Sequence, residues 1–313
     1  MALARIGRGV VHQALLGSVT LRVPKEVACD ILIAIKPMIE EAIEVGCKGG
    51  LPVSFRKLLV PLAGVDGDLA AIDAALVLGH EFQARIEALH ARTALGYSDP
   101  MEAGRVRALF SSRCKYYGIE ELGNQATDRM SARFLERQGM EADLIAEHGR
   151  LSDLIVFAHP HSTDLPWPNI SVQSALRESA RPVLLMPNTV TQVGKRNIIA
   201  WNGSLEAVRA VTFAIPILAR GENTLVVTVG KYDVQPSGEK VVEYLNCHGI
   251  EAESKIVPLE ESESSTLLSA SLTFGADLII LGAYTRHRTG RPVFGSMSIE
   301  MIKQNKIPIF MAH

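Results

Sequence analysis

Residues 281–298, LGAYTRHRTGRPVFGSMS, combine residue types that can bind a phosphate group. Gly282 and Gly295 frame a basic loop, and Ser296 follows where a helix is expected to begin. The N-terminus of a helix attracts anions, because it presents unpaired backbone N–H groups at the positive end of the helix dipole. Glycine allows the backbone to approach a ligand closely, and Arg288 can reach outer phosphate oxygens. The stretch predicts a phosphate cradle, unless the glycines only end a strand and the basic loop is solvated.

Other residue types that could do chemistry lack partners in the sequence. His159 and His161 have a spacing that could place two imidazoles near a metal ion. Beyond Asp164 no acidic or Cys partner is evident, so no metal site is expected. The sequence contains no G-x-S-x-G elbow, no G-x-x-x-x-G-K-[ST] loop and no strand-linked G-x-G-x-x-G. No catalytic residue is therefore predicted.

The composition limits the class of protein. The chain has 313 residues, a formal net charge of -2 and 47% hydrophobic residues, which suits a soluble α/β protein. It does not suit a nucleic-acid binder, which usually has a basic face. The four cysteines form no C-x-x-C pair and fit a reducing compartment. No stretch is apolar enough to span a bilayer, and the N-terminus lacks the features of a secretion signal, so a cytoplasmic protein is expected.

The elements that would position the basic loop occur twice in the chain. The block KLLVPLAGVDGDLAAIDAALVLG at residues 57–79 recurs in shape as NIIAWNGSLEAVRAVTFAIPILA at residues 197–219. SDLIVFAHP, from Ser152, is echoed by ADLIILGAY, from Ala276, and SARPVLLMP is echoed by NKIPIFMAH. Because the order of the blocks is the same both times, the chain is predicted to contain two homologous halves.

Within each half, short continuous apolar runs alternate with segments of helical spacing. Expected strands include residues 198–200, 224–229, 256–257 and 278–281, and expected helices include residues 205–218 and 238–247. Continuous apolar strands are covered on both faces, as in a parallel sheet. Strands that alternate with helices imply right-handed crossovers and a doubly wound sheet. Ligands of such sheets bind beyond the carboxyl ends of the strands, and residues 281–298 begin at such an end.

The first fifty or so residues resemble a copy of only the final piece of a half. Gly7 and then Gly17-Ser18 precede an expected helix and an expected strand at residues 31–35. An isolated helix–strand unit cannot bury its apolar face alone, so it must pair with a sheet edge of this chain or of another. We divide the chain into a partial fragment and linker at residues 1–53, a first half at residues 54–190 and a second half at residues 191–313.

The glycine spacing of residues 281–298 resembles the nucleotide fingerprint of the universal stress protein family, which is Gly-x-x-Gly, nine residues, then Gly-Ser or Gly-Thr. Gly282 matches the first glycine, and Gly295 with Ser296 matches the end at the correct separation. Thr285 replaces the second glycine. If this position requires positive φ, a β-branched residue is strained there, so the loop would be reshaped or binding weakened.

The turn at residues 201–204, WNGS, resembles the Asp-Gly-Ser turn after the first strand of this family, which places Asn202 and Gly203 at the nucleotide site. Asn202 stands where Asp is expected to meet the nucleoside. It can accept and donate hydrogen bonds but lacks the stronger charged one. We add Ser298, whose hydroxyl can donate to a phosphate or cap the helix. The first half resembles the degenerate N-terminal half of tandem members, since Ala63 stands at the Asp position.

The resemblance implies a Rossmann-like, adenine nucleotide α-hydrolase-like fold with two tandem doubly wound parallel sheets. Each sheet would have five strands in the order 3-2-1-4-5. The last strands would pair, either between the two halves as an intramolecular pseudo-dimer or between two chains as a homodimer. The implied ligand is ATP or AMP in the C-terminal half. Mg²⁺ is not expected to be bound by the protein, because the loop at residues 281–298 contains no carboxylate.

Three hypotheses for the function follow. The first is a regulatory or protective stress-response protein whose C-terminal half binds an adenine nucleotide. The second is a ligand-free interaction module, in which the pseudo-dimer acts as a scaffold through its surfaces. The third is a slow nucleotide hydrolase, since the fold is shared with enzymes that cleave at the α-phosphate. None of the three involves a nucleic acid or a membrane as partner.

Overall fold

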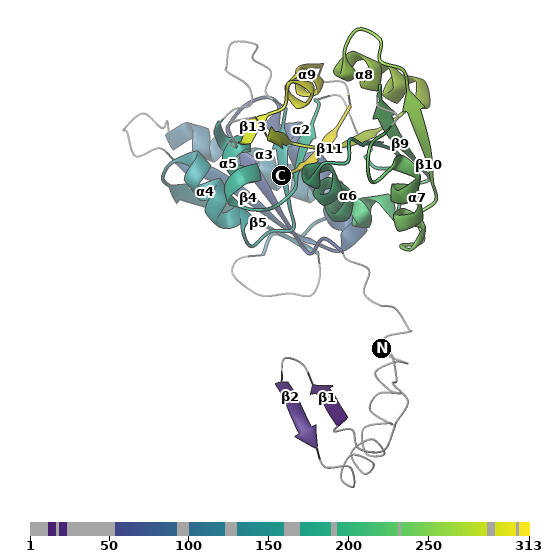
Figure 1. The fold of residues 1–313 in the computed structure, drawn as a ribbon. Coiled ribbons are helices and arrows are strands. Elements are labelled where there is room, and N and C mark those ends of the chain that lie inside the picture. The colour runs from purple at the N-terminus through teal and green to yellow at the C-terminus, as the bar shows by residue number, and fades with distance from the viewer. Residues whose placement is uncertain are drawn as a thin grey trace. The chain divides into compact units, whose positions relative to one another are not determined.

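The computed structural model describes residues 12–16, 19–23, 54–92, 100–122, 130–159, 170–188, 193–230, 233–286, 292–304 and 307–313 (Figure 1). The chain divides into two compact units, Met1–Pro52 and Val53–His313. In the described parts, no helix is both long enough and apolar enough to cross a membrane.

The N-terminal unit contains a pair of antiparallel strands. β1 (His12–Leu16) pairs with β2 (Val19–Val23). The sequence predicts a helix after Ser18, and β2 occupies the first residues of that segment, so the prediction is wrong there. The residues of β2 include Val19 and Thr20, whose branched side chains favour extended backbone over helix. The strand expected at residues 31–35 lies outside the described residues.

In the second unit, strands and helices alternate along the first half as the sequence predicts. The elements are β3 (Lys57–Leu62), α2 (Asp68–Phe82), β4 (Arg85–Arg92), α3 (Pro100–Tyr116), β5 (Ser131–Gln138), α4 (Glu141–Gly149), β6 (Leu154–Ala158), α5 (Ile170–Glu178) and β7 (Val183–Met186). These strands pair in parallel in the order β5-β4-β3-β6-β7. Numbered within the half, this is the expected order 3-2-1-4-5.

The second half repeats the pattern and adds a short hairpin. Its elements are β8 (Arg196–Ala200), α6 (Leu205–Leu218), β9 (Asn223–Val229), α7 (Gly238–Asn246), β10 (Ala252–Val257), α8 (Glu263–Phe274), β11 (Leu278–Gly282), β12 (Tyr284–Arg286), β13 (Pro292–Phe294), α9 (Ser296–Gln304) and β14 (Ile309–Ala312). The order β10-β9-β8-β11-β14 is again 3-2-1-4-5, and all pairs within it are parallel.

The two halves join through their last strands. β14 pairs antiparallel with β7, with Phe310 opposite Leu184, so the two five-stranded sheets form one sheet of ten strands. The pairing lies within one chain, as in the pseudo-dimer that the resemblance implies.

Contacts between side chains and backbone also connect the two halves. Nε2 of the buried His159, at the end of β6, donates to the carbonyl oxygen of Ile302 in α9. The guanidinium of Arg220, just after α6, lies 4.1 Å from the ring centroid of Phe82 and donates to the carbonyl oxygen of Glu81 at 3.2 Å.

Each face of the ten-stranded sheet has its own hydrophobic core. Helices α2, α3, α6 and α7 cover one face, and helices α4, α5, α8 and α9 cover the other. Neighbouring strand residues alternate between the cores, as Val226 and Val227 of β9 do. Both sides of the strands are therefore buried, which explains the continuous apolar runs in the sequence.

Candidate functional site

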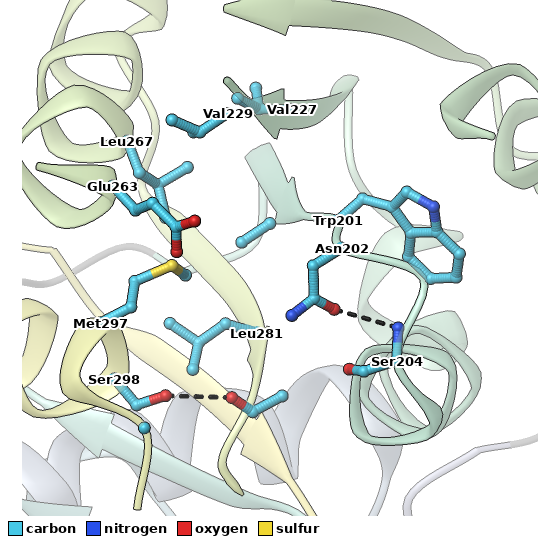
Figure 2. A pocket seen from close by; sticks show the side chains of 13 residues that line it. Trp201, Asn202, Ser204, Val227, Val229, Glu263, Leu267, Leu281, Met297 and Ser298 are labelled. Atoms are coloured by element: carbon cyan, nitrogen blue, oxygen red, sulfur yellow. Dashed lines mark hydrogen bonds between the residues drawn. The ribbon is translucent and has the colours of Figure 1, made fainter. Parts of the chain in front are cut away.

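A cavity of about 110 Å³ lies at the carboxyl ends of the strands in the second half (Figure 2). Its lining residues are Ala200, Trp201, Asn202, Ser204, Val227, Val229, Glu263, Leu267, Leu281, Gly282, Gly295, Met297 and Ser298. They come from the ends of β8, β9 and β11 and from the first turns of α8 and α9. Strand order reverses between β8 and β11, and such a reversal is where doubly wound sheets bind ligands.

Apolar and polar groups together line the cavity. The apolar side chains of the lining are those of Ala200, Trp201, Val227, Val229, Leu267, Leu281 and Met297. The polar groups are the side chains of Asn202, Ser204, Glu263 and Ser298 and the backbone at the two glycines. A flat apolar group and an anionic group of one ligand could therefore be bound together.

Asn202 presents a hydrogen-bond donor to the cavity. Its Oδ1 accepts a hydrogen bond of 3.1 Å from the backbone N–H of Ser204. The amide nitrogen points away from Ser204, towards the middle of the cavity (Figure 2). An Asp side chain would bring only acceptors to this place, so the change to Asn reverses the polarity that a ligand meets.

Gly203 and Ser204 shape the turn that carries Asn202. Gly203 has a φ of +72°, and a Cβ added to it would lie 2.7 Å from the carbonyl oxygen of Gln235, so both conformation and space require glycine. Ser204 is the N-cap of α6, and its hydroxyl oxygen accepts from the N–H of Ala207 at 3.1 Å.

Gly282 has a packing role that the sequence does not reveal. A Cβ at this position would lie 2.8 Å from the backbone nitrogen of Ala207 and 2.8 Å from Cβ of Glu206. The absent side chain thus lets the end of β11 lie directly against the first turn of α6. Gly282 also lines the cavity.

The start of α9 is the part of the site that resembles an anion cradle. Gly295 is buried and precedes the helix, which begins at Ser296, and its carbonyl oxygen accepts from the N–H of Ile299 at 3.1 Å. The first backbone N–H groups of α9 therefore lie beside the cavity. The hydroxyl of Ser298 donates to the carbonyl oxygen of Gly282 at 3.1 Å, so its proton is engaged inside the protein.

The segment after Gly282 is reshaped relative to a glycine-rich loop. Thr285 lies in β12 and pairs with Val293 of β13 in an antiparallel ladder. A β-branched residue favours such extended backbone, so the positive φ that would strain Thr285 is not needed here. Arg288 lies outside the described residues and stays a sequence-based prediction.

Glu263 is a charged cavity residue that was not among the site residues predicted from the sequence. It is the first residue of α8, and its side chain lines the cavity beside Leu267, one turn further along the helix. The signal in the sequence is the run SESS at residues 262–265, which forms a capping box and starts a helix. Because this helix follows the third strand of the half, its N-terminus reaches the same sheet edge as the glycine loop.

No described residue points to a metal centre. The described part of the chain contains no group of three His, Cys, Asp or Glu side chains that could hold a metal ion. His159 is buried and bonded to the backbone of α9, while His161 lies outside the described residues.

In the first half, the N–H groups of the turn that corresponds to residues 201–204 are bonded to the side chain of Asp68. The buried carboxylate of Asp68 accepts from the N–H groups of Gly64 at 2.7 Å, Val65 at 3.3 Å and Ala63 at 3.4 Å. Burial raises the pKa of Asp68, although these three hydrogen bonds act in the opposite direction. The amides of this turn are thus already used, with Ala63 at the register of Asn202.

A scan against protein-family models gave no match, and a search of curated proteins gave none. Among solved structures, a universal stress protein from Archaeoglobus fulgidus matches with a TM-score of 0.64 and 15% identity over 82% of this chain and 97% of that chain. A functionally unknown protein from Pseudomonas aeruginosa matches with a TM-score of 0.52 and 14% identity over 82% of this chain and 92% of that chain. A universal stress protein in complex with cAMP matches with a TM-score of 0.33 and 19% identity over 44% of this chain and 99% of that chain.

The Archaeoglobus fulgidus protein spans both halves of the chain, in agreement with the strand order 3-2-1-4-5 in each half. The TM-score of 0.64 shows that the two proteins share a fold. The chain therefore has the fold of the universal stress proteins, repeated in tandem within one ten-stranded sheet.

Proposed function

We propose that the C-terminal half binds an adenine nucleotide, ATP or AMP, and that the protein acts as a regulatory or protective binding protein in a stress response. The observation that carries the proposal is the position of the cavity. It lies at the strand-order reversal, between the turn of Asn202 and the N-terminus of α9.

The mixed lining of the cavity suggests how the nucleotide lies. The phosphate would meet the backbone N–H groups at Gly295 and Ser296, where the dipole of α9 favours an anion. The base would lie against the apolar side chains of Val227 and Val229 in β9 and of Leu267. Asn202 would donate from its amide nitrogen to an acceptor on the nucleoside.

The first half is proposed not to bind nucleotide. Asp68 supplies an internal carboxylate to the amides that follow β3, so a ligand group would have to displace it. This half would instead stabilise the second half through the strand pair β7 and β14.

The two other hypotheses receive less support. A hydrolase would need acid–base groups, and the described lining offers one carboxylate and no His, Cys or Lys. The hypothesis of a ligand-free interaction module gives the cavity no role. It becomes the preferred hypothesis if nucleotides fail to bind.

The test is a thermal-denaturation series of the full chain with AMP, ATP and cAMP. A ligand at about 100 times its Kd adds about 2.7 kcal/mol to the stability of the folded state, which raises the melting temperature by several degrees. Gly295→Val should remove the shift, because the new side chain would cover the first amides of α9. Gly104→Ala, on the far helix α3, is the control and should keep the shift. No shift with any of the three nucleotides would refute the proposal.

A further inference from the structure

Glu263 brings a negative charge into the cavity. Among the lining residues that the structure describes, it alone has a charged side chain. The carboxylate lies near Leu267, on the same face of α8, and near Met297 of α9 (Figure 2). Neighbouring apolar groups reduce the water around a carboxylate, and this strengthens a hydrogen bond that it accepts.

The position of Glu263 is fixed by hydrogen bonds on both sides of it. The hydroxyl of Ser262 accepts from the N–H of Ser265 at 3.1 Å, and the hydroxyl of Ser265 accepts from the N–H of Ser262 at 3.1 Å. The hydroxyl of Ser264 donates to the carboxylate of Glu300, which connects α8 to α9. Glu263 is therefore held on the first turn of α8 rather than on a free loop.

The cavity lining therefore combines groups of opposite polarity. Backbone N–H groups at the start of α9 suit an anion, whereas the carboxylate of Glu263 repels an anion and accepts hydrogen bonds. A ligand whose phosphate lies at the start of α9 is therefore best matched if its remaining part presents a hydrogen-bond donor to Glu263.

We propose that Glu263 determines ligand specificity by accepting a hydrogen bond from the nucleoside part of the bound nucleotide. The inference rests on the proposed function, because it concerns the same cavity. Two groups of AMP offer such a donor, the ribose hydroxyls and the exocyclic amine of adenine. The ribose hydroxyls and the adenine amine are both hydrogen-bond donors that a carboxylate can accept from. An analogue that lacks one of these donors shows which of them makes the contact.

The experiment is a calorimetric titration of the full chain with AMP, 2′,3′-dideoxy-AMP and IMP. The unsubstituted protein should bind AMP about 10- to 100-fold more tightly than the analogue that lacks the contacting donor, as expected for a hydrogen bond to a charged group. Glu263→Ala should bind AMP and that analogue about equally, and Glu263→Gln should show an intermediate preference. Glu261→Gln, an exposed neighbour, is the matched control and should keep the full preference.

The outcomes separate this inference from the proposed function. If the unsubstituted protein binds AMP and Glu263→Ala keeps both the affinity and the preference, Glu263 is not the specificity residue, while the nucleotide proposal survives. If AMP does not bind to the unsubstituted protein, both proposals fall. A melting temperature of Glu263→Ala without ligand that equals that of the unsubstituted protein shows that lost binding is not lost folding.

Discussion

The hydroxyl of Ser298 donates a hydrogen bond of 3.1 Å to the carbonyl oxygen of Gly282, and this bond joins the first turn of α9 to the end of β11. These are the two elements between which the sequence predicts the phosphate cradle. The side chain of Ser298 thus positions the backbone that would contact a ligand, and the proton that could have been donated to a phosphate is used for this bond.

Replacing Ser298 by Ala should therefore weaken both the fold and the site. The loss of one buried hydrogen bond is expected to lower the free energy of unfolding by about 1 kcal/mol. Nucleotide affinity should fall as well, because the start of α9 is no longer tied to β11. Urea unfolding and calorimetric titration measure the two effects. Unchanged stability together with unchanged affinity would show that the bond is unimportant.

Gly282→Ala should destabilise the protein, since its new Cβ would lie 2.8 Å from the backbone nitrogen of Ala207. Such overpacking costs about 1–3 kcal/mol. Gly104→Ala is the matched change, because no heavy atom lies within 4 Å of an added Cβ in helix α3. It should stabilise the protein by about 1 kcal/mol, through better helix propensity. Equal effects of the two substitutions in urea unfolding would contradict this packing role of Gly282.

A buried carboxylate in the first half should make stability depend on pH. Glu87 contacts Nη2 of Arg133 at 2.8 Å, Nδ1 of His148 at 2.9 Å and Nζ of Lys57 at 3.4 Å. Burial alone would raise the pKa of Glu87, but the His148 hydrogen bond and the charges of Lys57 and Arg133 outweigh it and lower the pKa below the ordinary value.

The direction of the effect follows from this lowered pKa. The unfolded chain binds the proton at higher pH than the folded chain does, so the contribution of Glu87 is complete above the ordinary pKa. It is lost as the pH falls from that value through the folded pKa. Glu87→Gln should cost about 1–3 kcal/mol near pH 7 and progressively less in acid. A cost of Glu87→Gln that stays constant across the acid range in urea unfolding would disprove the linkage.

Two cysteines of the second unit should differ strongly in reactivity. Cys114 of α3 is buried. Its burial and, to a smaller extent, the negative charge of Glu121 raise the pKa of its thiol to about 12. Cys247, at the end of α7, is exposed. Because the thiolate is the reactive form, N-ethylmaleimide should label Cys247 in the folded protein and Cys114 only after unfolding. Peptide mass spectrometry reads each site separately, and rapid labelling of Cys114 under native conditions would contradict the expectation.

The regular elements of the second half are predicted closely from the sequence. Apolar spacing gives the helix at residues 205–218 with the bounds of α6, where Ser204 supplies the cap. The strand expected at residues 256–257 is the end of the longer β10 (Ala252–Val257). Its polar residues, such as Glu253 and Lys255, do not fit a continuous apolar run, because β10 is an edge strand with an exposed side.

The sequence predicts only part of the site, because some residues of the cavity are brought together by packing between elements far apart in the chain. Gly282 and Gly295, which are close in the sequence and belong to one motif, both line the cavity. Glu263 is missed because it belongs to a helix start some twenty residues before Gly282, with no motif that connects the two. The bond of Ser298 to Gly282 and the contact of Gly282 with α6 depend on three-dimensional packing, which spacing alone does not contain.

The strand pair β7 and β14 has a consequence for stoichiometry. Since both strands belong to one polypeptide, the two halves are synthesised in equal number and stay associated at any dilution, unlike two separate subunits. A substitution in one half therefore changes only one of the two five-stranded parts of the sheet, whereas in a homodimer the same substitution would change both subunits. A difference between equivalent positions of the two halves, such as Ala63 in the first and Asn202 in the second, is therefore present in every molecule.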